Sequence, residues 1–235
     1  MAKLQYHRVL IKLSGEALGQ AGRGIEVSKL NNIAFEIKAL HALGVELLVV
    51  MGAGNWWRKR QQGKGYDPAT ADYMGIISTD MNALALRDAL NKQGLKAEVF
   101  SYVGTEIKMI NKISKSAIDK ALRAKKIIIL AGGTGKPFFT TDTAAAQGAV
   151  RNKAEVIIKA GPADGVYSAD PKKHKNAEKF LSLSIREVLK KDLKVMDKAA
   201  FEICLKYKMP ILVCKWQKGN LLKAVTGSQI GTLVK

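Results

Sequence analysis

A chain of 235 residues, 47% of them hydrophobic, is long enough to bury one α/β core, and its longest apolar runs are far shorter than a membrane span. The 39 Lys and Arg against 20 Asp and Glu give a formal net charge of +19, which favours polyanionic partners such as nucleotides or nucleic acid. The lysines, Lys172 among them, are scattered over predicted helix faces and loops, with no sustained basic helix and no RNA-binding motif with interleaved aromatic residues. We therefore expect a soluble globular protein that attracts nucleotides, and neither a membrane protein nor a specific nucleic-acid binder.

The N-terminal residues and the cysteines bear on the cellular location. The stretch MAKLQYHRVLIK alternates charged and apolar residues and lacks the apolar core of a signal peptide. Cys204 and Cys214 have neither the spacing of metal ligands nor a neighbouring His. We expect a cytoplasmic protein whose two cysteines are reduced and buried.

Apolar strands alternate with amphipathic helices through almost the whole chain. Ser28 is expected to cap the first long helix, Asp67 and Pro68 open the longest one, and Ser184 with Glu187 forms a capping box for a short one. The predicted strands are 8–12, 45–51, 98–103, 126–130, 156–160, 210–216 and 231–234, and the predicted helices are 28–43, 69–91, 114–124, one from 142, one from 184 and 196–208. This order predicts an α/β fold, with a mostly parallel sheet and helices on both faces, as a single domain over residues 1–235.

Residues 130–143, LAGGTGKPFFTTDT, form the strongest candidate for a phosphate-binding loop. The glycines follow an apolar strand and let the backbone approach a ligand closely, and residues 140–142 are of the types that cap the next helix. Free N–H groups and the positive end of a helix dipole would converge there. A Walker loop is excluded because Lys136 is followed by Pro137, and an ordinary strand-to-helix turn is the alternative.

Other polar residues follow the predicted strands at the carboxyl edge, where open α/β sheets bind their ligands. Lys12, Ser14 and Gly15 end the first strand and can meet a phosphate, although a lysine extending to solvent is the alternative. The second strand ends in another glycine turn at 52–55, and Arg58 behind it can make a bidentate phosphate contact or lie on the surface.

Three further side chains suit a nucleoside. Asp72, in the first turn of the longest helix, can hold a ribose or base, although the helix dipole alone favours a carboxylate there. Tyr167 and Asp170 follow the 156–160 strand and can offer a ring and an acceptor to an adenine or ribose. Their turn residues fit a simple hairpin nearly as well.

Six motifs span the chain: KLSGEAL, GAGNWWR, ADYMG with MNALALRDAL, GTGKPFFTTD, DGVYSADP and LKVMD. Together they resemble the bacterial uridylate (UMP) kinases of the amino-acid kinase superfamily, in order from residue 8 to residue 234. The pair of GTGKPFFTTD and LKVMD is the most specific part. The resemblance implies a three-layer αβα sandwich, transfer of a phosphoryl group from ATP to UMP with Mg²⁺, and a homohexamer.

The resemblance also implies site residues, position by position. It implies catalytic roles for Lys12, Arg58 and Asp142, with Asp197 near the reaction centre. The implied ATP site consists of Lys12, Leu13, Ser14, Gly15, Gly54, Arg58, Gly161, Tyr167 and Asp170. The implied UMP site consists of Ala53, Asp72, Thr134, Gly135, Lys136, Pro137, Phe138, Phe139, Thr140 and Thr141. No protein ligand for a metal is implied, because the phosphates of ATP carry the Mg²⁺.

Several positions depart from the usual pattern of that family. Ala53 stands for the middle Gly of GGGN, Lys59 for a Gly after Arg58, Asp80 for an apolar residue beside MNA, and Lys136 for the Asn of GTGNPFF. Gly161, Pro162 and Ala163 replace the Thr-Lys-Val of ATKVDG, so that a Thr hydroxyl and a Lys near the donor base are missing. The donor preference and the effectors are therefore left open.

The residue types suit phosphoryl transfer independently of the resemblance. A nucleoside monophosphate has its second pKa near ~6, so its attacking oxygen is ionised at neutral pH and needs no general base. Lys12, Arg58, the glycine-loop amides and Mg²⁺ would align the phosphates and neutralise their charge. The alternatives are a related kinase acting on a carboxylate or carbamate, a non-catalytic nucleotide- or oxyanion-binding protein on the same fold, and non-specific binding of nucleic acid.

Overall fold

The computed structural model describes residues 3–171 and 173–235, so Lys172 of the predicted basic surface lies outside it. Within the described residues the strands form a nine-stranded sheet in the order β4-β3-β5-β2-β1-β6-β10-β11-β9. Its strands are β1 Arg8–Leu13, β2 Glu46–Met51, β3 Ala97–Ser101, β4 Ile110–Lys112, β5 Ile127–Ala131, β6 Val156–Gly161, β9 Ser182–Leu183, β10 Ile211–Lys215 and β11 Thr232–Val234. Of the pairs of neighbours, β10 with β11 is antiparallel and the others are parallel. A separate antiparallel pair joins β7 Val166–Tyr167 to β8 Lys179–Phe180.

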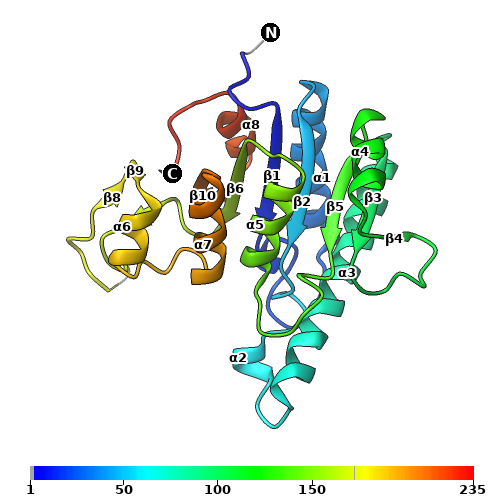
Figure 1. Cartoon of the computed structure of the whole chain (residues 1–235), viewed down its shortest axis with the longest axis horizontal. Coiled ribbons are helices and arrows are strands. Elements are labelled where there is room, and N and C mark those ends of the chain that lie inside the picture. Colours follow the sequence, from blue (N-terminus) through cyan, green and yellow to red (C-terminus); the bar gives the residue numbers. More distant parts are fainter. Residues whose placement is uncertain (1–2, 172) are drawn as a thin grey trace.

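Helices cover both faces of this sheet (Figure 1). The helices are α1 Val27–Ala42, α2 Lys59–Gln62, α3 Pro68–Lys92, α4 Lys115–Arg123, α5 Thr141–Arg151, α6 Ile185–Lys190, α7 Lys198–Tyr207 and α8 Asn220–Val225, with a 3₁₀ turn at Gly15–Ala17. The first core cluster packs α1, α3 and α8 against one face, and the second packs α4, α5, α6 and α7 against the other. The predicted three-layer αβα architecture with a mostly parallel sheet is confirmed.

The central strands are apolar on both faces because both faces are covered by helices. Val9 and Ile11 of β1 belong to the first core cluster, whereas Leu10 belongs to the second. Side chains of a strand alternate between the faces. Lys12 therefore lies on the same side as Leu10, under α5.

The helix starts agree with the predicted caps in two cases and differ in one. The Asp67 carboxylate accepts from Thr70 N at 2.8 Å, and Ser184 with Glu187 forms the predicted capping box. The prediction that Ser28 caps α1 is wrong, because the helix already begins at Val27. The N-cap is Glu26, whose backbone N–H donates to Leu18 O at 2.8 Å and so fixes the start of the helix.

Cys204 and Cys214 are both free and buried, as predicted. They lie in different core clusters, on opposite faces of the sheet. Burial raises the pKa of the Cys204 thiol to about 12 and that of Cys214 to about 11, so both are unreactive thiols. In the part of the chain that the structure describes, no helix combines the length and the apolar character that crossing a membrane requires.

Gly148 lets α5 approach the sheet closely, and its replacement by alanine is expected to destabilise the protein by about 1 to 2 kcal/mol. A Cβ at this position would lie 2.7 Å from Leu130 Cδ1 and 3.2 Å from Leu10 Cδ1, and both leucines are buried in the core. Urea denaturation measures the loss.

Gly75 of α3 provides a matched control, because its Cβ would meet Trp57 Cδ1 at an ordinary 3.5 Å. Gly75→Ala should stabilise the protein by up to about 1 kcal/mol through helix propensity. Changes of the same sign in both variants would contradict the close packing of α5.

Candidate active site

Two lysines and one aspartate form a buried ionic cluster at the carboxyl end of β1 and β6. The two strands are parallel neighbours in which Lys12 pairs in register with Lys159, and both side chains point to the face that α5 covers. Asp142, in the first turn of α5, lies between them: Lys12 Nζ is 2.6 Å from Asp142 Oδ1, and Lys159 Nζ is 2.7 Å from Asp142 Oδ2. The exposed fractions of these side chains are only 9%, 19% and 14% for Lys12, Lys159 and Asp142.

The charges of the cluster and its burial shift the pKa values of Asp142 and Lys159. Burial alone would raise the pKa of Asp142, but the charges of Lys12 and Lys159 outweigh it and hold that pKa below its ordinary value. Burial and the neighbouring charge of Lys12 lower the pKa of Lys159, against the opposing effect of Asp142. Two ammonium groups thus share one carboxylate in a largely buried position, and this arrangement suits an anionic ligand.

Asp197 connects this cluster to the start of α5. It caps α7 by accepting from Ala200 N at 2.8 Å, and it accepts from the hydroxyl of Thr143 at 2.8 Å. Thr140, the N-cap of α5, also donates its hydroxyl to Asp197, and it accepts from Asp142 N at 3.0 Å. The N-terminus of α5, with its free N–H groups, is therefore fixed beside the lysines.

Helix α3 anchors both glycine turns that flank the cluster. Asn82 is fully buried, donates to Gly52 O at 2.8 Å and exchanges two 2.9 Å hydrogen bonds with the amide of Asn55. One turn earlier in α3, the Thr79 hydroxyl accepts from Gly132 N at 2.9 Å. One rigid helix thus sets the positions of two loops that are far apart in the sequence.

The loops after β1 and β2 are in direct backbone contact. A Cβ on Gly15 would lie 2.4 Å from Gly54 N, so only glycine fits at this position. Arg58 donates from Nε to Gly54 O at 3.2 Å and forms an ion pair with Glu16. Arg58 therefore lies beside the glycine turn after β2, and its charge is paired with that of Glu16.

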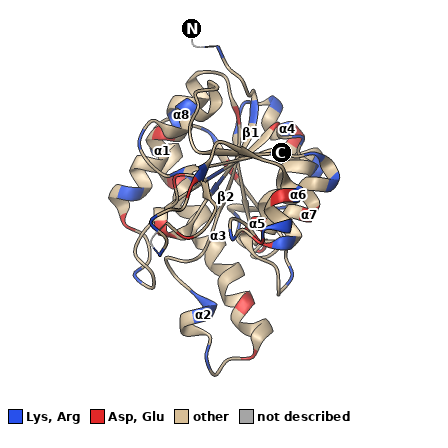
Figure 2. Ribbon diagram, turned by 90° about the vertical axis from the view of Figure 1, so that its left-hand side faces the viewer, with Lys and Arg blue, Asp and Glu red and all other residues tan. Residues whose placement is uncertain are grey.

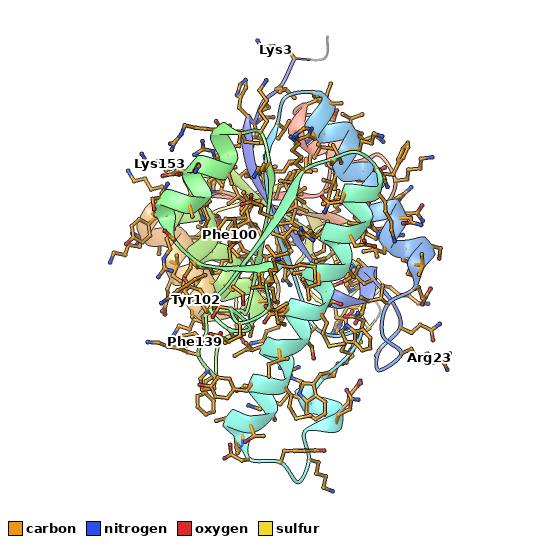
Figure 3. The ribbon with its side chains drawn as sticks, turned by 90° about the vertical axis from the view of Figure 1, so that its right-hand side faces the viewer. Lys3, Arg23, Phe100, Tyr102, Phe139 and Lys153 are labelled. Carbon is orange, nitrogen blue, oxygen red and sulfur yellow. The ribbon has the colours of Figure 1, made fainter. Side chains whose placement is uncertain are left out.

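Most of the predicted UMP residues lie on the loop between β5 and α5, at the end of the sheet where α3 projects (Figure 1). The loop folds tightly, with Gly135 N donating to Gly132 O at 2.8 Å, and Thr134 Oγ1 accepting from Lys136 N at 3.3 Å. It runs against Tyr102, since a Cβ on Gly135 would lie 2.8 Å from Tyr102 Cβ. Figure 3 shows Phe139 and Tyr102 toward the same end of the molecule.

Asp72 joins this loop from α3. Its Oδ2 accepts from Phe138 N at 2.9 Å and lies 2.8 Å from Lys59 Nζ of α2. The structure thus brings together Asp72 and the 134–141 loop, as the sequence predicts. Ala53 lies on the adjacent loop after β2, where its carbonyl accepts from Trp56 N at 2.8 Å.

The predicted ATP nucleoside residues lie at the end of β6 and beyond it. Tyr167 donates to Asp164 Oδ1 at 2.9 Å, and Lys179 Nζ of β8 lies 3.0 Å from Asp164 Oδ2. The hydrogen bond to Asp164 raises the pKa of Tyr167. Gly161 has open space where a Cβ would stand, and the Asp170 carbonyl accepts from His174 N at 2.9 Å in the same segment. The hairpin alternative also holds in part, because Tyr167 pairs with Lys179.

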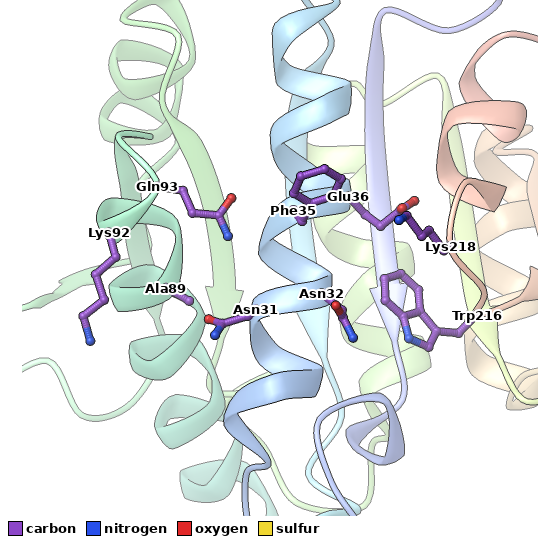
Figure 4. Close-up of a pocket in the computed structure, with 9 residues that line it drawn as sticks. All are labelled: Asn31, Asn32, Phe35, Glu36, Ala89, Lys92, Gln93, Trp216 and Lys218. Atoms are coloured by element: carbon purple, nitrogen blue, oxygen red, sulfur yellow. The ribbon is translucent and has the colours of Figure 1, made fainter.

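A surface groove of about 680 Å³ lies elsewhere. Figure 4 shows it between α1, the end of α3 and the segment after β10, with Phe35, Gln93 and Trp216 among its lining residues. Helices α1 and α3 cover the face of the sheet opposite to α5, so this groove is not part of the ionic cluster. In Figure 2 the Lys and Arg positions are spread over several helices rather than gathered in one stripe.

Known proteins resemble this chain in sequence and in fold. The model of the amino acid kinase family matches residues 7–215. The chain belongs to the amino acid kinase family. The crystal structure of UMP kinase from Bacillus anthracis superposes with a TM-score of 0.94 at 32% identity, covering 98% of this chain and 96% of that one. UMP kinase from Ureaplasma parvum has a TM-score of 0.91 at 31% identity, covering 99% and 100% of the two chains.

A more distant member of the family has the same fold. Uridylate kinase from Archaeoglobus fulgidus has a TM-score of 0.75 at 27% identity, covering 97% of this chain and 99% of that one. The resemblance to bacterial UMP kinases that the sequence motifs indicate is confirmed by the first two structures.

Several residues of this site are not among the site residues that the sequence predicts. Lys159 is the most important of them, and a signal existed, because β6 carries one lysine near the end of an otherwise apolar run, as β1 does with Lys12. Asn82 and Thr79 also hold the glycine turns of this protein. The helical pattern of the sequence does not show whether a buried polar side chain anchors a loop.

Proposed function

We propose that this protein is a UMP kinase, an enzyme that transfers the γ-phosphoryl group of ATP to UMP in pyrimidine nucleotide biosynthesis. The observation that carries the proposal is the cluster of Lys12, Lys159 and Asp142 at the start of α5, between the two glycine turns. Membership of the amino acid kinase family and the similarity to two bacterial UMP kinases support the choice of reaction and acceptor.

In this proposal the charged residues meet the phosphates and the loops hold the nucleosides. Lys12 and Lys159 neutralise the charge that develops on the transferred group, and Asp142 orients both ammonium groups. Arg58 exchanges its contact with Glu16 for a phosphate of ATP. Asp72 and the 134–141 loop hold UMP, whereas Gly161, Tyr167 and Asp170 border the ATP nucleoside.

The acceptor phosphate requires no general base, because its oxygen is already ionised at neutral pH. The task of the protein is then alignment: the N–H groups at the start of α5 and in the glycine turns bind oxygen atoms that the lysines neutralise.

Mg²⁺ fits this site as a partner of the ATP phosphates. Among the described residues, no cluster of three or more His, Cys, Asp or Glu side chains could hold a metal ion. Asp142 and Asp197, the carboxylates of the site, are engaged by lysines and by threonine hydroxyls. Bound together with ATP, Mg²⁺ would offset part of the negative charge of the phosphates.

We further expect a cytoplasmic homohexamer. Tyr73, Ile77 and Met81 follow one another at helical spacing on α3 and are 42%, 57% and 44% exposed. An apolar stripe of this kind on a long helix supports burial against another copy of the chain. Light scattering coupled to size-exclusion chromatography measures the assembly, and a monomer would contradict this part of the proposal.

The experiment that tests the activity is the release of ADP from Mg·ATP with UMP, CMP, dUMP or no acceptor. Release that depends on UMP is the expected result. Release with a carboxylate or carbamate acceptor instead would favour another kinase of the family. A folded protein that binds nucleotides but releases no ADP would favour the non-catalytic binding protein. Binding of nucleic acid that depends steeply on salt and shows no sequence preference would favour non-specific binding through the net positive charge.

A further inference from the structure

Lys59 connects three separate segments at the acceptor side of the site. Its Nζ lies 2.8 Å from Asp72 Oδ2 of α3 and 5.3 Å from the centre of the Phe138 ring on the loop before α5. The same Asp72 oxygen accepts from Phe138 N at 2.9 Å. Lys59 belongs to the short helix α2, so one side chain ties α2, α3 and the loop together.

Phe138 needs such a restraint. Its φ of +68° lies in the left-handed region, which residues with a side chain rarely adopt. The residue is 69% exposed, so hydrophobic burial does not hold it in place. The contacts that oppose the strain are the hydrogen bond from its N–H to Asp72 and the Lys59 ammonium over its ring.

Asp72 is oriented by the same contacts. Its two polar contacts in the described structure, to Lys59 and to Phe138 N, both use Oδ2. Oδ1 is thereby left as an acceptor on a side chain that is 18% exposed. A carboxylate oxygen held in this way is suited to accept the hydroxyl groups of a nucleotide sugar.

We propose that Lys59 is a positioning residue for the acceptor nucleotide, because it fixes the Asp72 carboxylate and the Phe138 backbone in the geometry that binds the sugar. This inference rests on the proposed UMP kinase function. Lys59 acts through Asp72 before the reaction begins, so its removal should weaken UMP binding and leave the chemical step unchanged.

The test compares Lys59→Met and Lys59→Arg with the wild type. The measured quantities are the KM for UMP, kcat, and the Kd for UMP alone by isothermal titration calorimetry. Lys59→Met should raise KM and Kd about 5- to 10-fold and change kcat less than about twofold, because a half-exposed ion pair makes a modest contribution to binding. Lys59→Arg, which keeps the cation, should restore most of the binding.

Arg60→Met is the matched control, since it removes the same charge from the next residue of α2, which contacts neither Asp72 nor Phe138. It should leave KM and Kd unchanged. Equal effects of Arg60→Met and Lys59→Met would show that only the overall charge matters and would overturn the inference. A loss of kcat with unchanged KM in Lys59→Met would overturn it as well.

A double-mutant cycle with Asp72→Asn isolates the contact. Because Lys59 acts through Asp72, Lys59→Met should have little further effect on Kd in the Asp72→Asn background. Additive effects would overturn the inference while UMP-dependent ADP release by the wild type still supports the proposed function. A wild-type protein that neither binds nor phosphorylates UMP would overturn both.

Discussion

Replacement of Lys159 by methionine is expected to lower kcat on the order of 10²-fold or more, and Lys12→Ala should have an effect of the same order. Both ammonium groups contact Asp142 and lie beside the start of α5, where charge on the transferred phosphoryl group would develop. Neutralising that charge in a nearly dry site has a much larger effect than a surface contact would have. Steady-state kinetics with UMP and Mg·ATP measure kcat and both KM values.

The control for these variants is Lys120→Met, which removes an exposed lysine from α4 on the same face of the sheet. It should leave kcat unchanged. The thermal stability of each variant has to be measured as well, because the loss of one buried lysine leaves the Asp142 carboxylate with a single cationic partner. A folded Lys159→Met protein with wild-type kcat would remove Lys159 from the mechanism, and the same result for Lys12→Ala would remove Lys12.

The second large effect is expected for Asp80→Asn, which should stabilise the protein above about pH 6. Asp80 is 4% exposed, its Oδ1 has no hydrogen-bond partner among the described residues, and no lysine or arginine pairs with it there. Burial raises its pKa to about 6, although a hydrogen bond from Ser101 opposes the rise. The carboxyl group is confined between α3 and the loop after β3, where a Cβ on Gly104 would lie 2.9 Å from Asp80 Oδ2.

The sign of the pH dependence follows from proton binding. Between about pH 4 and pH 6 the folded protein keeps the proton on Asp80 while the unfolded chain loses it, so the free energy of unfolding decreases as the pH rises through this window. Above pH 6 the penalty is constant, at about 3 kcal/mol for a shift of roughly two pKa units. Asp80→Asn removes the ionisation and should therefore gain up to that amount at neutral pH and almost nothing near pH 4.

Urea denaturation across this pH range measures the gain. Asp88→Asn is the control, because Asp88 lies on the same helix but is exposed and paired with Lys92. Its effect should stay within about 0.5 kcal/mol at every pH. A difference between wild type and Asp80→Asn that does not change with pH would contradict a buried ionisable carboxyl group.

Much of the fold could be predicted from hydrophobic pattern alone. Strands such as β1, β2 and β5 are apolar runs because both of their faces are buried, and the long helices have clear periodicity and caps. The strands β4, β8 and β9 and the helices α2 and α8 are not among the predicted elements, since segments of two to six residues show little periodicity. These short elements form because of their contacts with the rest of the fold, and not because of the secondary-structure preference of their own residues. The equally short α6 could be predicted from its capping box.

The candidate site likewise has features that the sequence predicts and contacts that it does not. The chemistry of single segments could be predicted from the sequence: glycine turns follow apolar strands, Lys12 ends a strand, and Asp142 starts a helix. These features are local, because backbone freedom and capping depend on adjacent residues.

Which of these segments come into contact depends on the three-dimensional fold. Lys159 joined the site because β6 pairs with β1 in a register that places it beside Lys12. Lys59 contacts Asp72 because α2 folds back onto α3, and Asp80 is a buried carboxyl because the loop after β3 covers it. Register and packing between distant segments arise from burial of the whole core, and this is why no local pattern contains them.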